Sequence, residues 1–143
     1  MIAEVLALPA WRLAVDVGLA VLSWLVQLVI YPAFAAIARP GFCTWHARYT
    51  RRISLVVVPL MLGQLALHAV ALWRAPSWPG GLQALLLAVA WAATFLVAVP
   101  CHRRLGAAGC ELPVLRRLLR ANAVRTAAWT LVAGISGGVV LAG

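Results

Sequence analysis

The chain has no lysine, and only three of its 143 residues are acidic. Charged residues make up 10% of the sequence, whereas soluble globular proteins carry about 25%. A soluble domain is therefore implausible. The acidic residues Glu4, Asp16 and Glu111 are expected at the periphery of the protein, and so few carboxylates exclude catalysis by a carboxylate pair. The sequence also holds no Ser-His-Asp set and no glycine motif that cradles phosphate.

Cysteine is scarce as well, with three residues in the chain. Cys43, Cys101 and Cys110 all fall on the side predicted below to be cytoplasmic, where thiols stay reduced, so disulfides are not expected. Thiols and imidazoles are the ligands that zinc and copper prefer. Here, however, Cys101 and His102 are adjacent, and Cys43 with His46 forms no paired C-x-x-C motif. We therefore expect no metal site.

Apolar residues, by contrast, make up 65% of the chain, and its mean hydropathy is +1.00. A helix of about 20 apolar residues spans the hydrocarbon core of a bilayer, and residues 13–37, 53–73, 82–101 and 124–142 meet that length. We expect the first segment to be retained rather than cleaved as a signal peptide, because Glu4 precedes any positive charge. The predicted fold is all-α, a single domain over residues 1–143 built as a bundle of four transmembrane helices.

The arginines are distributed unevenly between the loops. Ten of the twelve lie in two stretches, Arg39–Arg52 and Arg103–Arg125, which separate the first apolar segment from the second and the third from the fourth. Cytoplasmic loops of membrane proteins carry an excess of positive charge. The pattern predicts a multi-pass protein of the cell inner membrane with both arginine-rich loops in the cytoplasm and both termini outside it. Arg12 and Asp16, four residues apart, are expected to pair at the outer interface.

The net charge of +9 could indicate either a nucleic acid or a lipid partner. Arginines beside apolar spans pair with anionic headgroups, so we expect contact with the lipid bilayer at its cytoplasmic face. No aromatic and basic stacking platform lies outside the membrane, so nucleic acid is not expected. Residues 113–121 are predicted to form a short amphipathic helix on the inner leaflet, because Pro113 can begin a helix and leucines alternate with arginines after it.

Polar residues from all four segments fall near the cytoplasmic end, where topology alone brings them together. They are Tyr31, His46, Tyr49, Thr50, His102, Asn122, Arg125 and Thr126. We assign acid–base catalysis to His46, His102 and Tyr49, because histidine titrates near neutral pH. Arg125 could hold an anionic or polar headgroup. The other predicted ligand-binding residues are Gln27, Tyr31, Gln64, Asn122 and Thr126. The alternative interpretation is an interfacial network that satisfies helix ends and lipid phosphates.

Polar and proline residues also occur inside the spans. At 1.5 Å per residue, Gln27 and Gln64 are each on the order of 15–18 Å deep, close to the bilayer midplane. They could hydrogen-bond each other and join two helices, as polar side chains in membranes often do, or they could contact a ligand. Pro32 and Pro100 are expected to kink or end their helices, and Pro59 to kink the second.

The histidines leave haem open as a cofactor. His46 and His68 lie 22 residues apart on one predicted helix, which separates them by about 33 Å and prevents them from sharing one iron. His46 and His102 could serve together as axial ligands. No cofactor is firmly implied.

Four short motifs carry a family resemblance over most of the chain. They are Gln27-x-x-x-Tyr31-Pro32, Phe42-x-x-x-His46-x-x-Tyr49-Thr50-x-x-Ile53, Pro100-x-His102-x-x-Leu105 and Asn122-x-x-Arg125-Thr126-x-x-Trp129. The set is similar to uncharacterised small bacterial four-helix membrane proteins, and its layout resembles the anthrone-oxygenase-like family. The resemblance implies binding or oxidation of a hydrophobic aromatic or isoprenoid-like molecule. His102 stands where that family commonly has asparagine. Haem-dependent protoporphyrinogen oxidases share the size and helix count, but the histidine of their first helix is missing here.

These observations favour one function and leave two alternatives. The favoured function is an integral inner-membrane protein with a polar pocket at the cytoplasmic end of the bundle, which binds a lipophilic small molecule and oxidises or isomerises it through histidine, tyrosine and arginine. The first alternative is a non-catalytic accessory or assembly subunit that packs against a protein partner or a second copy of itself. The second is a haem- or metal-binding protein that acts in electron transfer.

Overall fold

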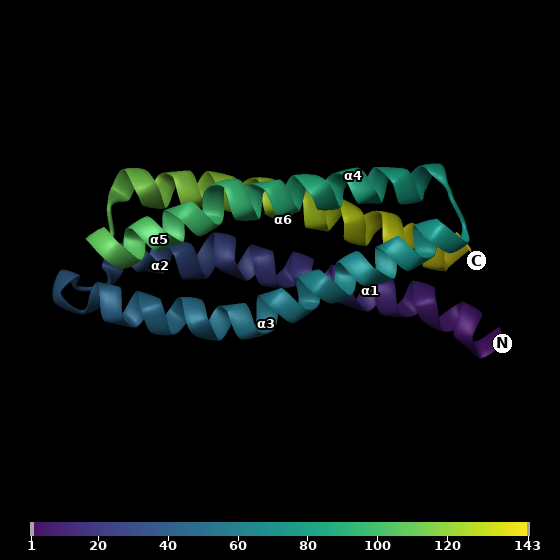
Figure 1. The fold of residues 1–143 in the computed structure, drawn as a ribbon, viewed down its shortest axis with the longest axis horizontal. Helices are drawn as coiled ribbons and strands as arrows, with labels where there is room; N and C mark the ends of the chain where they lie inside the picture. The colour runs from purple at the N-terminus through teal and green to yellow at the C-terminus, as the bar shows by residue number, and fades with distance from the viewer. Residues whose placement is uncertain (1, 143) are drawn as a thin grey trace.

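The computed structural model describes residues 2–142, and within that range it describes all side chains except those of residues 2–7 and Arg39. Four long helical rods run side by side and antiparallel, which confirms the predicted all-α bundle (Figure 1). Along the chain the elements are α1 (Ile2–Leu25), η1 (Val26–Ile30), α2 (Tyr31–Ala33), η2 (Phe34–Ala36), α3 (Arg39–Arg74), α4 (Trp78–Ala92), η3 (Ala93–Ala98), α5 (Val99–Ala108) and α6 (Leu112–Ala142).

Each rod is long and apolar enough to cross a membrane. The four candidate spans are Leu8–Ala36, Pro40–Arg74, Trp78–Ala108 and Leu112–Ala142. Large apolar side chains cover the outside of the bundle; Leu28, Leu55 and Leu96, for example, are exposed. A monomeric soluble protein rarely exposes so large an apolar surface, whereas lipid tails solvate it without cost. The chain is a multi-pass membrane protein whose outer surface contacts the bilayer.

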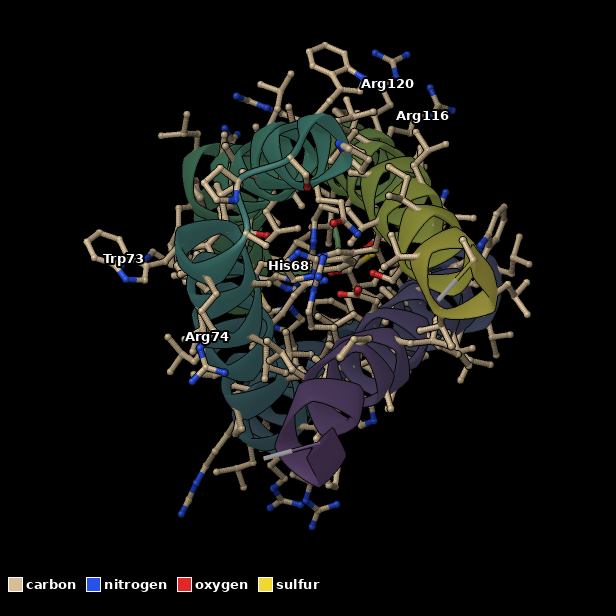
Figure 2. All side chains as sticks on the ribbon, turned by 90° about the vertical axis from the view of Figure 1, so that its right-hand side faces the viewer. His68, Trp73, Arg74, Arg116 and Arg120 are labelled. Carbon is tan, nitrogen blue, oxygen red and sulfur yellow. The ribbon has the colours of Figure 1, made fainter. Side chains whose placement is uncertain are left out.

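The two ends of the bundle differ in composition. The chain termini and the α3–α4 turn lie together at one end, on the right in Figure 1, which we call the terminal end. The η2–α3 and α5–α6 connections lie at the other, which we call the arginine-rich end. Seen from the terminal end, His68 lies in the middle of the bundle, whereas Arg74, Arg116 and Arg120 point outward (Figure 2).

The helices extend further than the apolar segments predict. α3 begins at Arg39, so the predicted first cytoplasmic loop is helical from that residue on. The separate interfacial helix predicted for residues 113–121 is wrong, because α6 runs without a break from Leu112 to Ala142. No proline or glycine interrupts the chain between Pro113 and Gly134, and Leu115 and Leu118 pack into the core instead of lying on a leaflet.

Two prolines lie beside widened turns of the helix. The backbone N–H of Tyr31 donates to the carbonyl of Val26, and that of Val99 donates to the carbonyl of Thr94, five residues back in each case. Pro32 and Pro100 follow immediately. A proline ring cannot donate to the carbonyl four residues earlier and clashes with it, and a π-helical turn moves that carbonyl away. The prediction that Pro32 and Pro100 end their helices is therefore wrong: the rods continue to Ala36 and Ala108.

Candidate functional site

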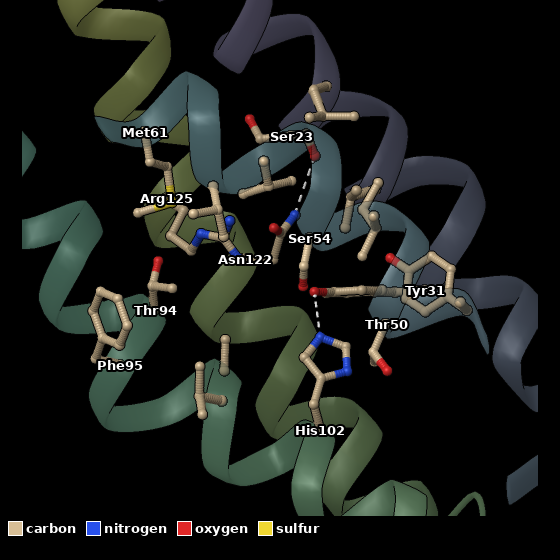
Figure 3. Close-up of a pocket in the computed structure, with 18 of the residues that line it drawn as sticks. Ser23, Tyr31, Thr50, Ser54, Met61, Thr94, Phe95, His102, Asn122 and Arg125 are labelled. Atoms are coloured by element: carbon tan, nitrogen blue, oxygen red, sulfur yellow. Dashed lines mark hydrogen bonds between the residues drawn. The ribbon is translucent and has the colours of Figure 1, made fainter. Parts of the chain in front are cut away.

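A cavity of about 430 Å³ lies between the rods in the half of the bundle nearer the arginine-rich end (Figure 3). Apolar side chains such as Val57 and Met61 form much of its wall. Val58 and Phe95 also line it and are exposed at the surface. Among the described residues, α3 packs against α4 and α5 but makes little contact with η3 between them. The cavity therefore reaches the lipid-facing surface between α3 and η3.

Most of the predicted site residues line this cavity, although they come from four different elements. Tyr31 belongs to α2, His46 and Tyr49 to α3, His102 to α5, and Asn122 and Arg125 to α6; all six are cavity-lining residues. Topology brings them together as the sequence suggested, because each lies near the arginine-rich end of its rod.

Tyr31, His102 and His46 form a continuous chain of hydrogen bonds. The Tyr31 hydroxyl lies 2.9 Å from Nε2 of His102, and Nδ1 of His102 lies 3.0 Å from Nε2 of His46. Phe34 packs edge-on against both imidazole rings and holds them in place. A neutral imidazole has one donor and one acceptor nitrogen. The three groups can therefore all donate in one direction or all in the other, and a proton entering at one end can leave at the other.

Arg125 brings an uncompensated positive charge to the cavity. Its side chain is 8% exposed, and its guanidinium carbon lies 4.7 Å from the centre of the Trp129 ring. Its buried Nε has no hydrogen-bond partner within the described part of the chain. The hydroxyls of Tyr31 and Tyr49 lie within electrostatic reach, but no acidic residue is found among the lining residues. A buried cation at membrane depth normally has a partner, so this geometry favours an anion or a strong acceptor in the cavity.

Asn122 lies beside Arg125, one helical turn away. Its amide nitrogen donates to the carbonyl of Ser23 at 3.1 Å and to Oε1 of Gln27 at 2.9 Å, while its own Oδ1 is buried without a partner. Thr126 donates to the carbonyl of Asn122 at 2.9 Å. Gln27 and Thr126, both predicted to bind a ligand, do not line the cavity and instead join α6 to the first rod.

The predicted contact between Gln27 and Gln64 is wrong. Gln64 donates to Asp16 at 2.7 Å and accepts from the Trp129 indole at 3.0 Å, and it lies outside the cavity lining. Gln27 lies in η1, where the widened turn rotates its side chain toward Asn122. Equal depth in the membrane therefore did not place the two glutamines on facing surfaces.

The sequence analysis missed a second polar cluster nearer the terminal end. Asp16 was expected at the periphery, paired with Arg12, but its side chain is fully buried and accepts from Gln64, His68 and Ser136. Arg12 bonds instead to His68 at 3.3 Å and to Gln83 at 2.6 Å. The expectation about the third acidic residue, Glu4, falls outside the described side chains.

A signal for this cluster was present in the sequence. Asp16 precedes Ser23 by seven residues and Ser136 follows Trp129 by seven, which places the two residues of each pair on the same face of their helix. Gln83 likewise stands eleven residues before Thr94 on the face that Leu87 and Ala90 bury. Following these helix faces for about two to three turns toward the terminal end predicts the cluster.

The two histidines proposed as haem ligands do not fit that role. His46 and His102 bond directly to each other through ring nitrogens 3.0 Å apart, and their ring centres are 5.2 Å apart. A haem with two axial histidines requires a porphyrin plane between those nitrogens, and this arrangement leaves no room for one. Within residues 8–142, leaving out Arg39, no three His, Cys, Asp or Glu side chains are grouped as a metal site would require.

Comparisons of the chain with known protein families, with curated proteins and with solved structures found no match. The class that the fold and the site define is therefore a four-helix membrane protein with a buried polar network of histidine and aspartate. The features of this site that bear on a finer function are the cavity, the hydrogen-bonded chain along its wall, and a buried arginine with no acidic residue among its fellow lining residues.

Proposed function

We propose that this protein binds a lipophilic small molecule in the 430 Å³ cavity, with the polar head of the ligand at Arg125 and Asn122. One observation carries the proposal: Nε of the buried Arg125 guanidinium finds no hydrogen-bond acceptor within the described part of the chain, yet Arg125 lines a cavity with apolar walls. Ligand sites of this size are typically apolar, with a few polar groups that fix orientation. An anionic or strongly accepting head would satisfy Arg125, and an amide or hydroxyl donor would satisfy Oδ1 of Asn122.

The route into the cavity supports a ligand that arrives from the membrane. The opening between α3 and η3 is flanked by Val58 and Phe95, which are exposed to lipid. In the orientation that the arginine distribution favours, the arginine-rich end faces the cytoplasm and both termini face outward across the inner membrane. The cavity then opens toward the inner leaflet, and the anionic headgroups of that leaflet pair with the exposed arginines.

The chemistry that this site can supply is proton transfer. Tyr31, His102 and His46 all line the cavity and are joined by hydrogen bonds, and such a chain can deliver a proton to a bound ligand or remove one. Isomerisation needs only this transfer. Oxidation of the kind implied by the anthrone-oxygenase-like resemblance also needs an electron acceptor. Tyr49, stacked on Trp45 at 5.5 Å, forms a wall of the same cavity. The accessory-subunit alternative stays a prediction.

Mass spectrometry of the molecules that copurify with the protein in mild detergent tests the proposal. We expect a lipophilic compound with the wild type, its loss with Arg125→Met, and its retention with the matched control Arg120→Met, which removes an exposed arginine of the same helix. His102→Phe should retain the compound but block its conversion. A wild-type protein that carries only bulk phospholipid, with no difference between the two arginine variants, would overturn the proposal.

A further inference from the structure

The cluster around Asp16 is a closed ring of hydrogen bonds contributed by all four rods. Its side chains are Arg12, Asp16, His68, Gln83 and Ser136. Arg12 donates to Oε1 of Gln83 at 2.6 Å, Gln83 to Ser136 at 2.8 Å, and Ser136 to Asp16 at 2.6 Å. On the other side, His68 lies 3.1 Å from Asp16 and 3.3 Å from Arg12.

The direction of every bond in the ring follows from groups that can only donate. Arginine has no acceptor, so Nδ1 of His68 must accept from Arg12, and the proton of this neutral imidazole must lie on Nε2, which donates to Asp16. The indole of Trp129 also only donates, so Gln64 turns its oxygen to Trp129 and its NH₂ group to Asp16. Three donors therefore face the Asp16 carboxylate, which is the arrangement an ionised carboxylate requires.

A second cavity, of about 550 Å³, joins this ring to the terminal end. Arg12, His68 and Gln83 line it together with residues of the α3–α4 turn, among them Pro76 and Ser77. Figure 2 looks toward this end and shows His68 at the centre of the bundle. The cavity offers water a route to His68 and offers the long Arg12 side chain room to withdraw. The Nε of Arg12 is buried without a partner, so the closed position satisfies this side chain incompletely.

We propose that His68 and Asp16 form a proton-binding site that is reached from the terminal end through the second cavity. Arg12 blocks this site as long as it is bonded to Nδ1 of His68. A proton from water in the second cavity binds Nδ1 of His68. Because that nitrogen then becomes a donor, Arg12 must leave it. The products are an imidazolium–aspartate pair, joined by the existing Nε2 contact of 3.1 Å, and an arginine displaced into the cavity.

Among the described side chains, Arg74 of α3 is the one other charged group that lines the second cavity, and it is exposed and points outward from the bundle. Among the described side chains, α1 contributes Arg12 and Asp16 to the ring and α3 contributes His68, while α4 and α6 contribute only the neutral Gln83 and Ser136. The nearest charge on α6 is Arg125, on the far side of Trp129. Protonation of this site thus depends on the competition of two cations, Arg12 and protonated His68, for the one carboxylate of Asp16.

Nitrogen-15 NMR of histidine-labelled protein in liposomes tests this inference, with the His68 signal assigned by its loss in His68→Gln. At neutral pH we expect wild-type His68 to be neutral, with its proton on Nε2. In Arg12→Met it should become doubly protonated, and adding Asp16→Asn should return it to the neutral form. The control Arg120→Met, which removes an equal charge from an exposed site, should leave His68 unchanged.

Two results would overturn the inference: a wild-type His68 with its proton on Nδ1, or an unchanged His68 signal in Arg12→Met. Unshifted His46 and His102 signals would show that the variant still folds, since these residues lie in the other polar cluster. If Arg12→Met fails to accumulate, acid titration of the wild type decides the question. His68 should then gain its second proton as the Arg12 side-chain signals shift together with it, and independent titration of the two would contradict the proposed displacement.

Discussion

Of the acidic side chains that the structure describes, Asp16 is fully buried, at 0% exposure, and three donors surround it. A carboxylate in hydrocarbon is costly unless it is paired and hydrogen-bonded. Glu111 is in the opposite situation, because its 3.1 Å ion pair with Arg104 lies in the α5–α6 connection with both side chains substantially exposed. Exposed pairs contribute little because water screens them. The two acidic residues should therefore differ sharply in their contribution to stability.

We expect Asp16→Ala to lower the free energy of unfolding by about 3 kcal/mol or more, because it leaves Gln64, His68 and Ser136 without an acceptor and Arg12 without its counter-charge. Glu111→Ala should change it by roughly 0–1 kcal/mol. Thermal unfolding in detergent, followed by circular dichroism, measures both. Equal effects of the two substitutions would contradict the buried network.

At the level of single residues, topology predicted one polar cluster and missed the other. Tyr31, His46, His102 and Arg125 could be grouped because the ends of antiparallel helices must meet at one face of the membrane. Asp16 could not, because an apolar run that begins at residue 13 places Asp16 at the interface, whereas the candidate span already includes Leu8. Hydrogen-bond partners depend on the rotation of each helix, which hydropathy does not report.

The π-helical turns η1 and η3 are the elements that shape the site. Each ends just before a proline, and each lies close to a member of the hydrogen-bonded chain: Tyr31 follows η1 directly, and His102 lies four residues after η3. Such turns rotate the residues that follow them relative to an unbroken α-helix, and they are frequent at functional sites. η3 also borders the opening to lipid through Phe95.

We expect Pro100→Ala to allow η3 to return to α-helical geometry, because residue 100 then has an N–H to donate to the carbonyl of Leu96. The turn would rotate Phe95 and shift His102 away from Tyr31. Copurified ligand should fall several-fold at equal protein, while helicity measured by circular dichroism stays the same. Pro113→Ala, in the first turn of α6, is the matched control. Full ligand occupancy in Pro100→Ala would contradict this role for η3.

The lengths of the apolar runs were enough to predict that four helices exist, but they did not predict where each helix begins and ends. The arginine-rich stretches 39–52 and 112–125 are helical although they interrupt the apolar pattern. Arginine favours helix, and its long side chain can reach a headgroup from a helical backbone. The π-helical turns left no trace in the hydropathy pattern, and only Pro32 and Pro100 marked their places.

For the whole molecule, the proposed orientation can be tested with reporters of known compartment. Alkaline phosphatase fused after Gly143 should be active and green fluorescent protein fused there dark, because both termini are predicted to face outward. Cys110, in the α5–α6 connection, should react with an impermeant maleimide only from the cytoplasmic side. Burial raises the pKa of the Cys110 thiol, so labelling should be done above neutral pH. A fluorescent C-terminal fusion would reverse the assignment of the two ends.

The position of Arg12 has an electrical consequence. Its charge lies within a membrane span, beside a cavity that leads to the terminal end. Moving one elementary charge across a membrane held at 100 mV involves about 2.3 kcal/mol, and withdrawal of Arg12 covers part of that distance. In the proposed orientation a potential that is negative inside opposes outward movement of this cation. An energised membrane should therefore hold Arg12 in the closed ring, and a drop in membrane voltage should let Arg12 withdraw toward the terminal end more readily.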